Sequence, residues 1–114
     1  MLLKTPESEM YCRQNAHHLG VRVGNHHLYL DDPDQMDIRV HKIILHQDYD
    51  SWTIENDICL LELQSDADFS SSAVGSIALP SSMEEYPAGT DCTVSGWGTT
   101  SEGGSLGEVL MKVT

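Results

Sequence analysis

Residues 53–63 read Thr53-Ile54-Glu55-Asn56-Asp57-Ile58-Cys59-Leu60-Leu61-Glu62-Leu63, and they decide the fold because they set an acidic residue directly before a strand that reads as buried. From Ile58 to Leu63 the apolar positions follow the pattern of a short core strand. Carboxylates such as that of Asp57 are seldom buried without a partner. The sequence therefore predicts that Asp57 needs a hydrogen-bonding group.

A second motif, Cys92-Thr93-Val94-Ser95-Gly96-Trp97-Gly98, lies downstream, and His46-Gln47-Asp48-Tyr49 precedes the first. Together these stretches resemble the His-Pro-x-Tyr, Asn-Asp-Ile-Ala-Leu-Leu-x-Leu and Cys-x-Val-x-Gly-Trp-Gly segments of the chymotrypsin/trypsin-like serine endopeptidases (peptidase S1). Gln47 and Cys59 depart from that pattern, and neither changes the carboxylate itself. The resemblance covers roughly residues 12–114, which is most of the chain.

The resemblance implies an all-β fold, namely part of the trypsin-like double Greek-key β-barrel. A full double barrel takes about 220 to 250 residues, whereas this chain has 114. We therefore expect an incomplete chain made of several parts. They are residues 1–11, an unmatched N-terminal segment; residues 12–91, a partial N-terminal β-barrel with the inter-barrel linker; and residues 92–114, the first hairpin of a truncated C-terminal β-barrel.

Alternating apolar residues and turn signals predict the strands within this plan. The predicted strands are Val21–Val23, Leu28–Leu30, Asp37–His46 and Ile58–Leu63 in the first barrel, and residues 92–97 and 108–114 in the hairpin. Ile38, Val40 and Ile44 are expected on one face of the longest strand. Residues 64–89 are polar and rich in Ser and Pro, which is typical of a connection between domains.

The resemblance assigns the triad aspartate to Asp57. In this family the aspartate orients a histidine, and the histidine deprotonates the nucleophilic serine. The histidine should stand directly before Cys12, but Tyr11 occupies that position, and a phenol with a pKa of about 10 is no neutral base. His17 and His18 lie too far beyond it for the geometry that general-base catalysis requires. The serine is absent, because the chain contains no Gly-Asp-Ser-Gly-Gly segment.

These residues predict a fragment of a trypsin-like serine endopeptidase, a hydrolase that cleaves peptide bonds, with this chain alone inactive. The alternative is a non-catalytic serine-protease homologue that binds a protein partner through loops such as Gly24–Gln35. A third hypothesis is a divalent-metal module built from the histidines and the Asp31–Asp34 cluster. Trypsin-like and chymotrypsin-like specificity both stay open, because the residues that select the substrate side chain in the family have no match here.

The chain has three cysteines, an odd number that points to a missing partner in a secreted protein. By the resemblance, Cys12 and Cys92 pair with cysteines that this chain does not contain, so both are expected to be free thiols. Cys59 lies within the apolar strand and reads as a small buried hydrophobe. A metal site from Cys12, His17 and His18 matches no standard zinc spacing.

The segment Gly24–Gln35 resembles the calcium-binding loop of some family members. The candidate ligands by position are Asn25, His27, Leu30, Asp32 and Gln35. Asn25 and Gln35 stand where calcium-binding members carry glutamates, and calcium prefers charged oxygens. We therefore expect an acidic loop without an ion. No cofactor is predicted, and calcium is the single weak candidate.

Six Lys and Arg residues stand against eighteen Asp and Glu, which gives a net charge of -12. This balance disfavours nucleic acids and anionic membranes as partners. A protein or peptide substrate is the partner that the resemblance implies, and it implies an extracellular, secreted protein. The apolar run within Met1 to Met10 is too short for the hydrophobic region of a signal peptide. Because strands of the barrel are missing, exposed edges should also favour self-association or aggregation, and water should hydrate Asp57 in the opened barrel.

Overall fold

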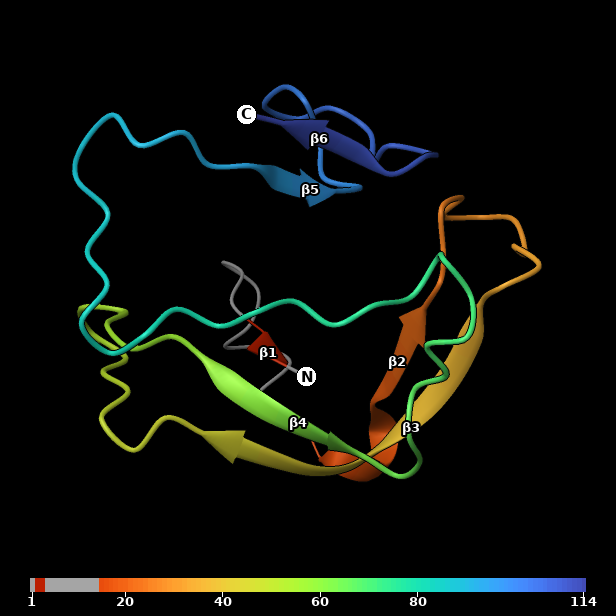
Figure 1. Ribbon diagram of the computed structural model, residues 1–114, viewed down its shortest axis with the longest axis horizontal. Coiled ribbons are helices and arrows are strands. Elements are labelled where there is room, and N and C mark those ends of the chain that lie inside the picture. The colour runs from red at the N-terminus through yellow and green to blue at the C-terminus, as the bar shows by residue number, and fades with distance from the viewer. Residues whose placement is uncertain (1, 4–14) are drawn as a thin grey trace. The chain divides into compact units, whose positions relative to one another are not determined.

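The computed structural model describes residues 2–3 and 15–114 (Figure 1). Strands dominate it, and within the described residues the only helix is the 3-10 turn η1 (Ala16–His18). The strands are β1 (Leu2–Leu3), β2 (Gly20–Val23), β3 (Met36–Leu45), β4 (Cys59–Leu63), β5 (Val94–Gly96) and β6 (Met111–Val113). The all-β prediction is confirmed. No described helix has the length and apolar character needed to cross a bilayer.

The described chain forms two compact units, each made of separate stretches of sequence. The first contains residues 2–3, 15–23 and 36–67, and the second contains Gly24–Gln35 and Asp68–Thr114. The loop between β2 and β3 therefore belongs to a different unit from the strands that it joins. The domain boundaries predicted from the sequence do not separate this loop from its flanking strands, and they stay a prediction.

The first unit is an antiparallel sheet in the order β1-β4-β3-β2. Its core consists of alternate residues that face one side of the sheet, as the period of two in a strand requires. The buried cluster is Val21, Val40, Cys59 and Leu61, with Val40 fully buried. Leu2 and Leu3 pair with Leu60 and Cys59, so part of the unmatched N-terminal segment forms an edge strand of this sheet.

A β-bulge in β3 corrects one predicted face. Val40 pairs with Leu63 and Lys42 pairs with Glu62, which leaves His41 as an extra residue in the ladder. An extra residue shifts every later side chain to the opposite face. Ile43 therefore packs against the core, and Ile44, predicted to lie with Ile38 and Val40, is 42% exposed.

The predicted strand Leu28–Leu30 does not form. Among the described residues, the only ladder contact there is an isolated bridge between His27 and Val109, supported by a 2.8 Å hydrogen bond from Leu28 N–H to the Glu108 carbonyl. The backbone amides of the preceding residues instead donate to the Asp32 side chain. Local side-chain hydrogen bonds of this kind compete with strand pairing.

The second unit contains the hairpin strands β5 and β6, which pair antiparallel with Ser95 opposite Lys112. Both strands are shorter than the predicted ranges 92–97 and 108–114. Residues 64–93 contain no helix or strand, as predicted for the polar stretch 64–89.

Candidate active site around Asp57

Asp57 lies at the centre of a tight turn directly before β4. The N–H of Ile58 donates to the carbonyl of Asn56 at 2.8 Å, which closes a three-residue turn around the aspartate. The N–H of His46, just after β3, donates to the carbonyl of Ile58 at 3.1 Å. The backbone that carries Asp57 is therefore fixed between the end of one core strand and the start of the next.

The loop before Asp57 contains two residues in the left-handed backbone region. Asn56 has a φ of 55°, and its side-chain amide donates to the carbonyl of Asp48 at 2.9 Å. Ile54 has a φ of 56°, which is a strained conformation for a β-branched residue. The carboxylate of Asp50 accepts from the N–H groups of Trp52 and Thr53 and holds the turn that precedes them. Strain in the backbone is thus stored within a few residues of the acid.

An open pocket of about 730 Å³ faces this turn. It is lined by His46, Ile54, Glu55, Asn56, Asp57 and Ile58. Asp57 is half-buried, and none of residues 2–3 and 15–114 donates a hydrogen bond to its carboxylate. The expected partner is not found among these residues, and Tyr11 and Cys12 lie outside them. Within the described part of the chain, the carboxylate oxygens therefore keep their capacity as acceptors.

His46 lines the same pocket, although no motif marks it as a site residue. Its Nδ1 accepts a 3.1 Å hydrogen bond from the N–H of Asp48, so the neutral imidazole carries its proton on Nε2. Nothing in the motif comparison separates His46 from an ordinary exposed histidine. His17 and His18, in contrast, are exposed on η1 and do not line this pocket.

The cysteines correct one prediction and confirm another. Cys59 is 2% exposed, as expected for a core position, but it is disulfide-bonded, and its partner lies outside the described residues. The interpretation of Cys59 as no more than a small buried hydrophobe was therefore wrong, because the residue also forms a disulfide. Cys92 is exposed and free, as predicted. The disulfide lies two residues after Asp57 and ties down the start of β4.

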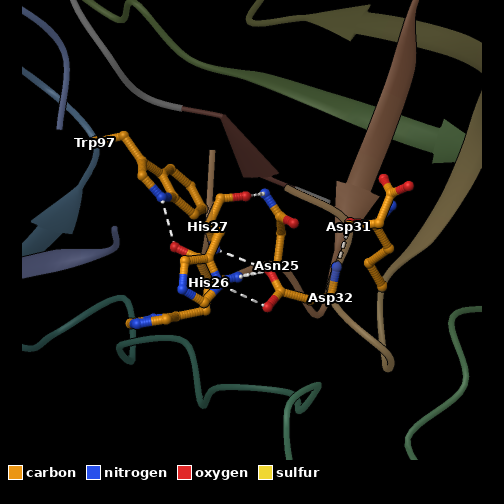
Figure 2. A network of polar contacts seen from close by, with 7 residues as sticks. Asn25, His26, His27, Asp31, Asp32 and Trp97 are labelled. Atoms are coloured by element: carbon orange, nitrogen blue, oxygen red, sulfur yellow. Dashed lines mark hydrogen bonds and ion pairs between the residues drawn. The ribbon is translucent and has the colours of Figure 1, made fainter. Parts of the chain in front are cut away.

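Four of the five calcium-loop candidates, Asn25, His27, Asp32 and Gln35, are joined to one another by hydrogen bonds, and Figure 2 shows those around Asp32. The fifth, Leu30, is exposed. Asp32 Oδ2 accepts from the backbone N–H groups of His26 and His27, both at 2.8 Å, and Asp32 Oδ1 lies 2.9 Å from Nδ1 of His27. The hydrogen bond from the His27 imidazole, followed by those from the two amides, lowers the pKa of Asp32 to about 2. Within the described chain, no group of three or more His, Cys, Asp or Glu residues is arranged to hold a metal ion.

Comparison with known proteins agrees with the motifs. The family model described as Trypsin matches residues 11–114. The chain belongs to the trypsin family. The prediction of a chymotrypsin/trypsin-like peptidase is confirmed at this level.

Curated relatives show how much of a trypsin this family member spans. Trypsin V-A of Rattus norvegicus is 44% identical over 92 residues, which are 81% of this chain and 36% of the relative. Anionic trypsin of Bos taurus is 37% identical over 97 residues, which are 85% of this chain and 37% of the relative. The trypsin-family chain thus spans about a third of the length of these relatives.

A solved structure supports the fold assignment. The structure described as "Structure of GrC" superimposes with a TM-score of 0.76 at 32% identity and covers 86% of this chain and 45% of its own. The sheet of the first unit and the hairpin of the second are therefore part of a trypsin-like β-barrel fold.

Proposed function

We propose that this trypsin-family chain is the part of a serine endopeptidase that supplies the triad aspartate, Asp57, and that these 114 residues alone do not hydrolyse peptide bonds. One observation carries the proposal. The half-buried Asp57 is held by a closed turn at the mouth of β4, with its carboxylate at an open pocket. That geometry suits an acid that orients a second side chain.

The chemistry required of such an aspartate is limited. It accepts a hydrogen bond from an imidazole N–H, fixes the tautomer and ring orientation, and stabilises the imidazolium that forms when the serine is deprotonated. The acid must therefore be immobile and keep an acceptor oxygen. Tyr11 replaces the base before Cys12, and the sequence holds no Gly-Asp-Ser-Gly-Gly segment, so these residues lack both proton acceptor and nucleophile.

A fluorophosphonate probe for active-site serines tests the inactive state. Purified chain is expected to stay unlabelled and to leave fluorogenic peptides with Arg or Phe before the scissile bond intact, while an active trypsin is labelled and cleaves the Arg substrate. Stoichiometric labelling of this chain would overturn the proposal.

A hybrid enzyme tests the role of Asp57. In the hybrid, residues 11–114 with Tyr11→His replace the matching segment of an active trypsin. Asp57→Asn in the hybrid should lower kcat by about 10⁴-fold, because the imidazole is then held in the wrong tautomer. Asp48→Asn is the matched control and should leave kcat nearly unchanged. Equal losses in the two variants would exclude a special role for Asp57.

By the same proposal, the full-length protein is extracellular, and its substrates are proteins or peptides. The disulfide at Cys59 supports that location, because disulfides persist in oxidising compartments.

A second candidate function is binding of a protein partner without catalysis. Tyr29 and Leu30 favour it, because both side chains are exposed on a hydrogen-bonded loop beside a small pocket of about 190 Å³. A cooperative melt of a monomer, with saturable calorimetric binding of a basic peptide that is lost in a Tyr29→Ala/Leu30→Ala variant, would support it. Broad, scan-rate-dependent aggregation would count against it.

A further inference from the structure

The carboxylate of Asp32 is already occupied by donors from its own loop. The N–H groups of His26 and His27 both reach Oδ2, and the imidazole of His27 reaches Oδ1 (Figure 2). An ionised carboxylate has about four lone-pair sites. With three donors bound, this acid has little capacity left for a cation.

Two further candidate oxygens are occupied in the same way. The side-chain amide of Asn25 donates to the carbonyl of His27 at 2.9 Å, and the N–H of Asp32 donates to Oε1 of Gln35 at 3.1 Å. The amide nitrogen of Gln35 then donates to Asp31 at 2.9 Å. N–H groups of the loop therefore already occupy lone pairs that a bound cation would need.

One candidate side-chain oxygen is the exception. Oδ1 of Asn25 is buried and has no hydrogen-bond partner among the described residues. Calcium takes about six to eight oxygen ligands and prefers charged ones. Even together with the backbone carbonyl of Leu30, one neutral amide oxygen falls far short of that set, so the donor chemistry of the loop does not fit calcium.

Residues near the C-terminal end of the second unit bind the carbonyl side of His26. The carbonyl of His26 accepts from the indole N–H of Trp97 at 3.0 Å and from the N–H of Leu110 at 2.8 Å. The N–H of His26 donates to Asp32 of the same loop, so the backbone of this residue is held on one side by its own loop and on the other by Trp97 and Leu110, which are distant in the sequence. The indole of Trp97 thereby reports on the conformation of the loop.

From these contacts we infer that the loop Gly24–Gln35 is closed by its own side chains and binds no calcium ion. The Asp32 clasp, defined as Asp32 with the two His26 and His27 amides and the His27 imidazole, takes the place that a cation holds in calcium-binding members of the family. The inference does not rest on the proposed function, because none of these residues lines the Asp57 pocket.

Calcium addition tests the inference directly. In a Trp52→Phe variant, Trp97 becomes the only tryptophan and its emission reports on the loop. Neither the emission nor the melting temperature should change between millimolar calcium and EGTA, and terbium should show no luminescence sensitised by Trp97. A calcium-dependent rise in melting temperature, or sensitised terbium emission, would overturn the inference.

Variants in the same background test the clasp itself. Asp32→Asn should shift the Trp97 emission and lower the melting temperature equally with calcium and with EGTA. Asp34→Asn, a neighbouring acid without a hydrogen bond to its side chain from any described residue, should do neither. If Asp32→Asn does not fold, His27→Gln removes only the imidazole contact and should still shift the emission. Emission unchanged in His27→Gln would refute the clasp.

A gain-of-binding variant completes the design. Asn25→Glu/Gln35→Glu removes two amide donors and adds two carboxylates, so calcium should now raise its melting temperature. Asn25→Gln/Gln35→Asn is the uncharged control and should stay indifferent to calcium. A calcium response in the control would show that the wild-type oxygens already suffice, contrary to the inference.

Discussion

Asp57 combines a half-buried position with a carboxylate that no residue among 2–3 and 15–114 donates to. Removing one partner of a buried ion pair costs about 3 to 5 kcal/mol, whereas a side chain without such a partner changes stability by about 0.5 kcal/mol or less. We therefore expect Asp57→Asn to leave the free energy of unfolding in urea nearly unchanged.

The neighbouring residue is the control for this measurement. Asn56→Ala should cost about 1 to 2 kcal/mol, because alanine tolerates the left-handed backbone poorly and the bond to Asp48 is lost. A cost above about 2 kcal/mol for Asp57→Asn would reveal a buried partner for the carboxylate.

At the residue scale, sequence reasoning identified the chemistry but not the contacts. The motif points to Asp57. The sequence does not reveal, however, that Ile54 and Asn56 adopt a positive φ, or that His46 lines the pocket. The disulfide at Cys59 was missed, because cysteine spacing does not determine connectivity. The loop oxygens were chosen by type, while the donors that occupy them depend on rotamers and turns.

At the scale of elements, the bulge in β3 makes a prediction about two adjacent isoleucines. Ile43→Ala should cost about 2 kcal/mol or more, because its side chain packs against the buried cluster. Ile44→Ala should cost less than about 1 kcal/mol, since its side chain is 42% exposed. Denaturant melts of both variants measure the difference, and a reversed order would show that the register continues without the bulge.

The Arg22–Asp37 pair links β2 to β3 and gives a pH-dependent prediction. The guanidinium donates to both carboxylate oxygens, at 2.6 and 2.8 Å, and this hydrogen bonding lowers the pKa of Asp37 from 3.8. The folded state thus holds the charged acid more strongly than the unfolded state does. Its contribution is complete above about pH 4 and is lost as the pH falls through the lowered pKa.

Melting temperatures from pH 7 down to pH 2 check this. Asp37→Asn should melt slightly below the wild type at pH 7, because exposed pairs contribute little, and the two curves should converge in acid. Added salt should narrow the gap at pH 7. A gap that is constant at all pH values would rule out the ion pair as its source.

The strands that alternate cleanly could be predicted, and the irregular elements could not. Three strands begin and end within one residue of their predicted bounds, because one face of each is buried; they are β2 (Gly20–Val23), β3 (Met36–Leu45) and β4 (Cys59–Leu63). The β-bulge at His41 could not be predicted, because no residue type in this stretch signals an extra residue in the strand. Residues 28–30 have a strand-like pattern, but the Asp32 clasp binds the amides of His26 and His27 directly before them and fixes a loop conformation in which the ladder does not continue.

At the scale of the whole molecule, large apolar side chains remain on the surface together with a net charge of -12. Val94 and Val113 pair across the exposed hairpin, and Ile77 is 88% exposed. Like charges keep copies apart at low ionic strength, and salt screens that repulsion. We expect sedimentation velocity to show self-association that increases with salt.

Val94→Thr/Val113→Thr should reduce this association, because it lowers the apolar area of the hairpin while keeping β-branched side chains. Thr99→Ala/Thr100→Ala is the control on the adjoining loop and should leave it unchanged. A chain that stays monomeric at high salt and high concentration would contradict the expectation.

The bond between His26 and Trp97 spans 71 residues of sequence, and this separation has a consequence for synthesis. At ribosomal rates of about 5 to 20 residues per second, the loop emerges roughly 4 to 14 seconds before the indole that completes its binding. The Asp32 clasp spans only five or six residues and can form while the chain is still growing. The loop can therefore adopt its conformation during synthesis, before the hairpin that binds it has been made.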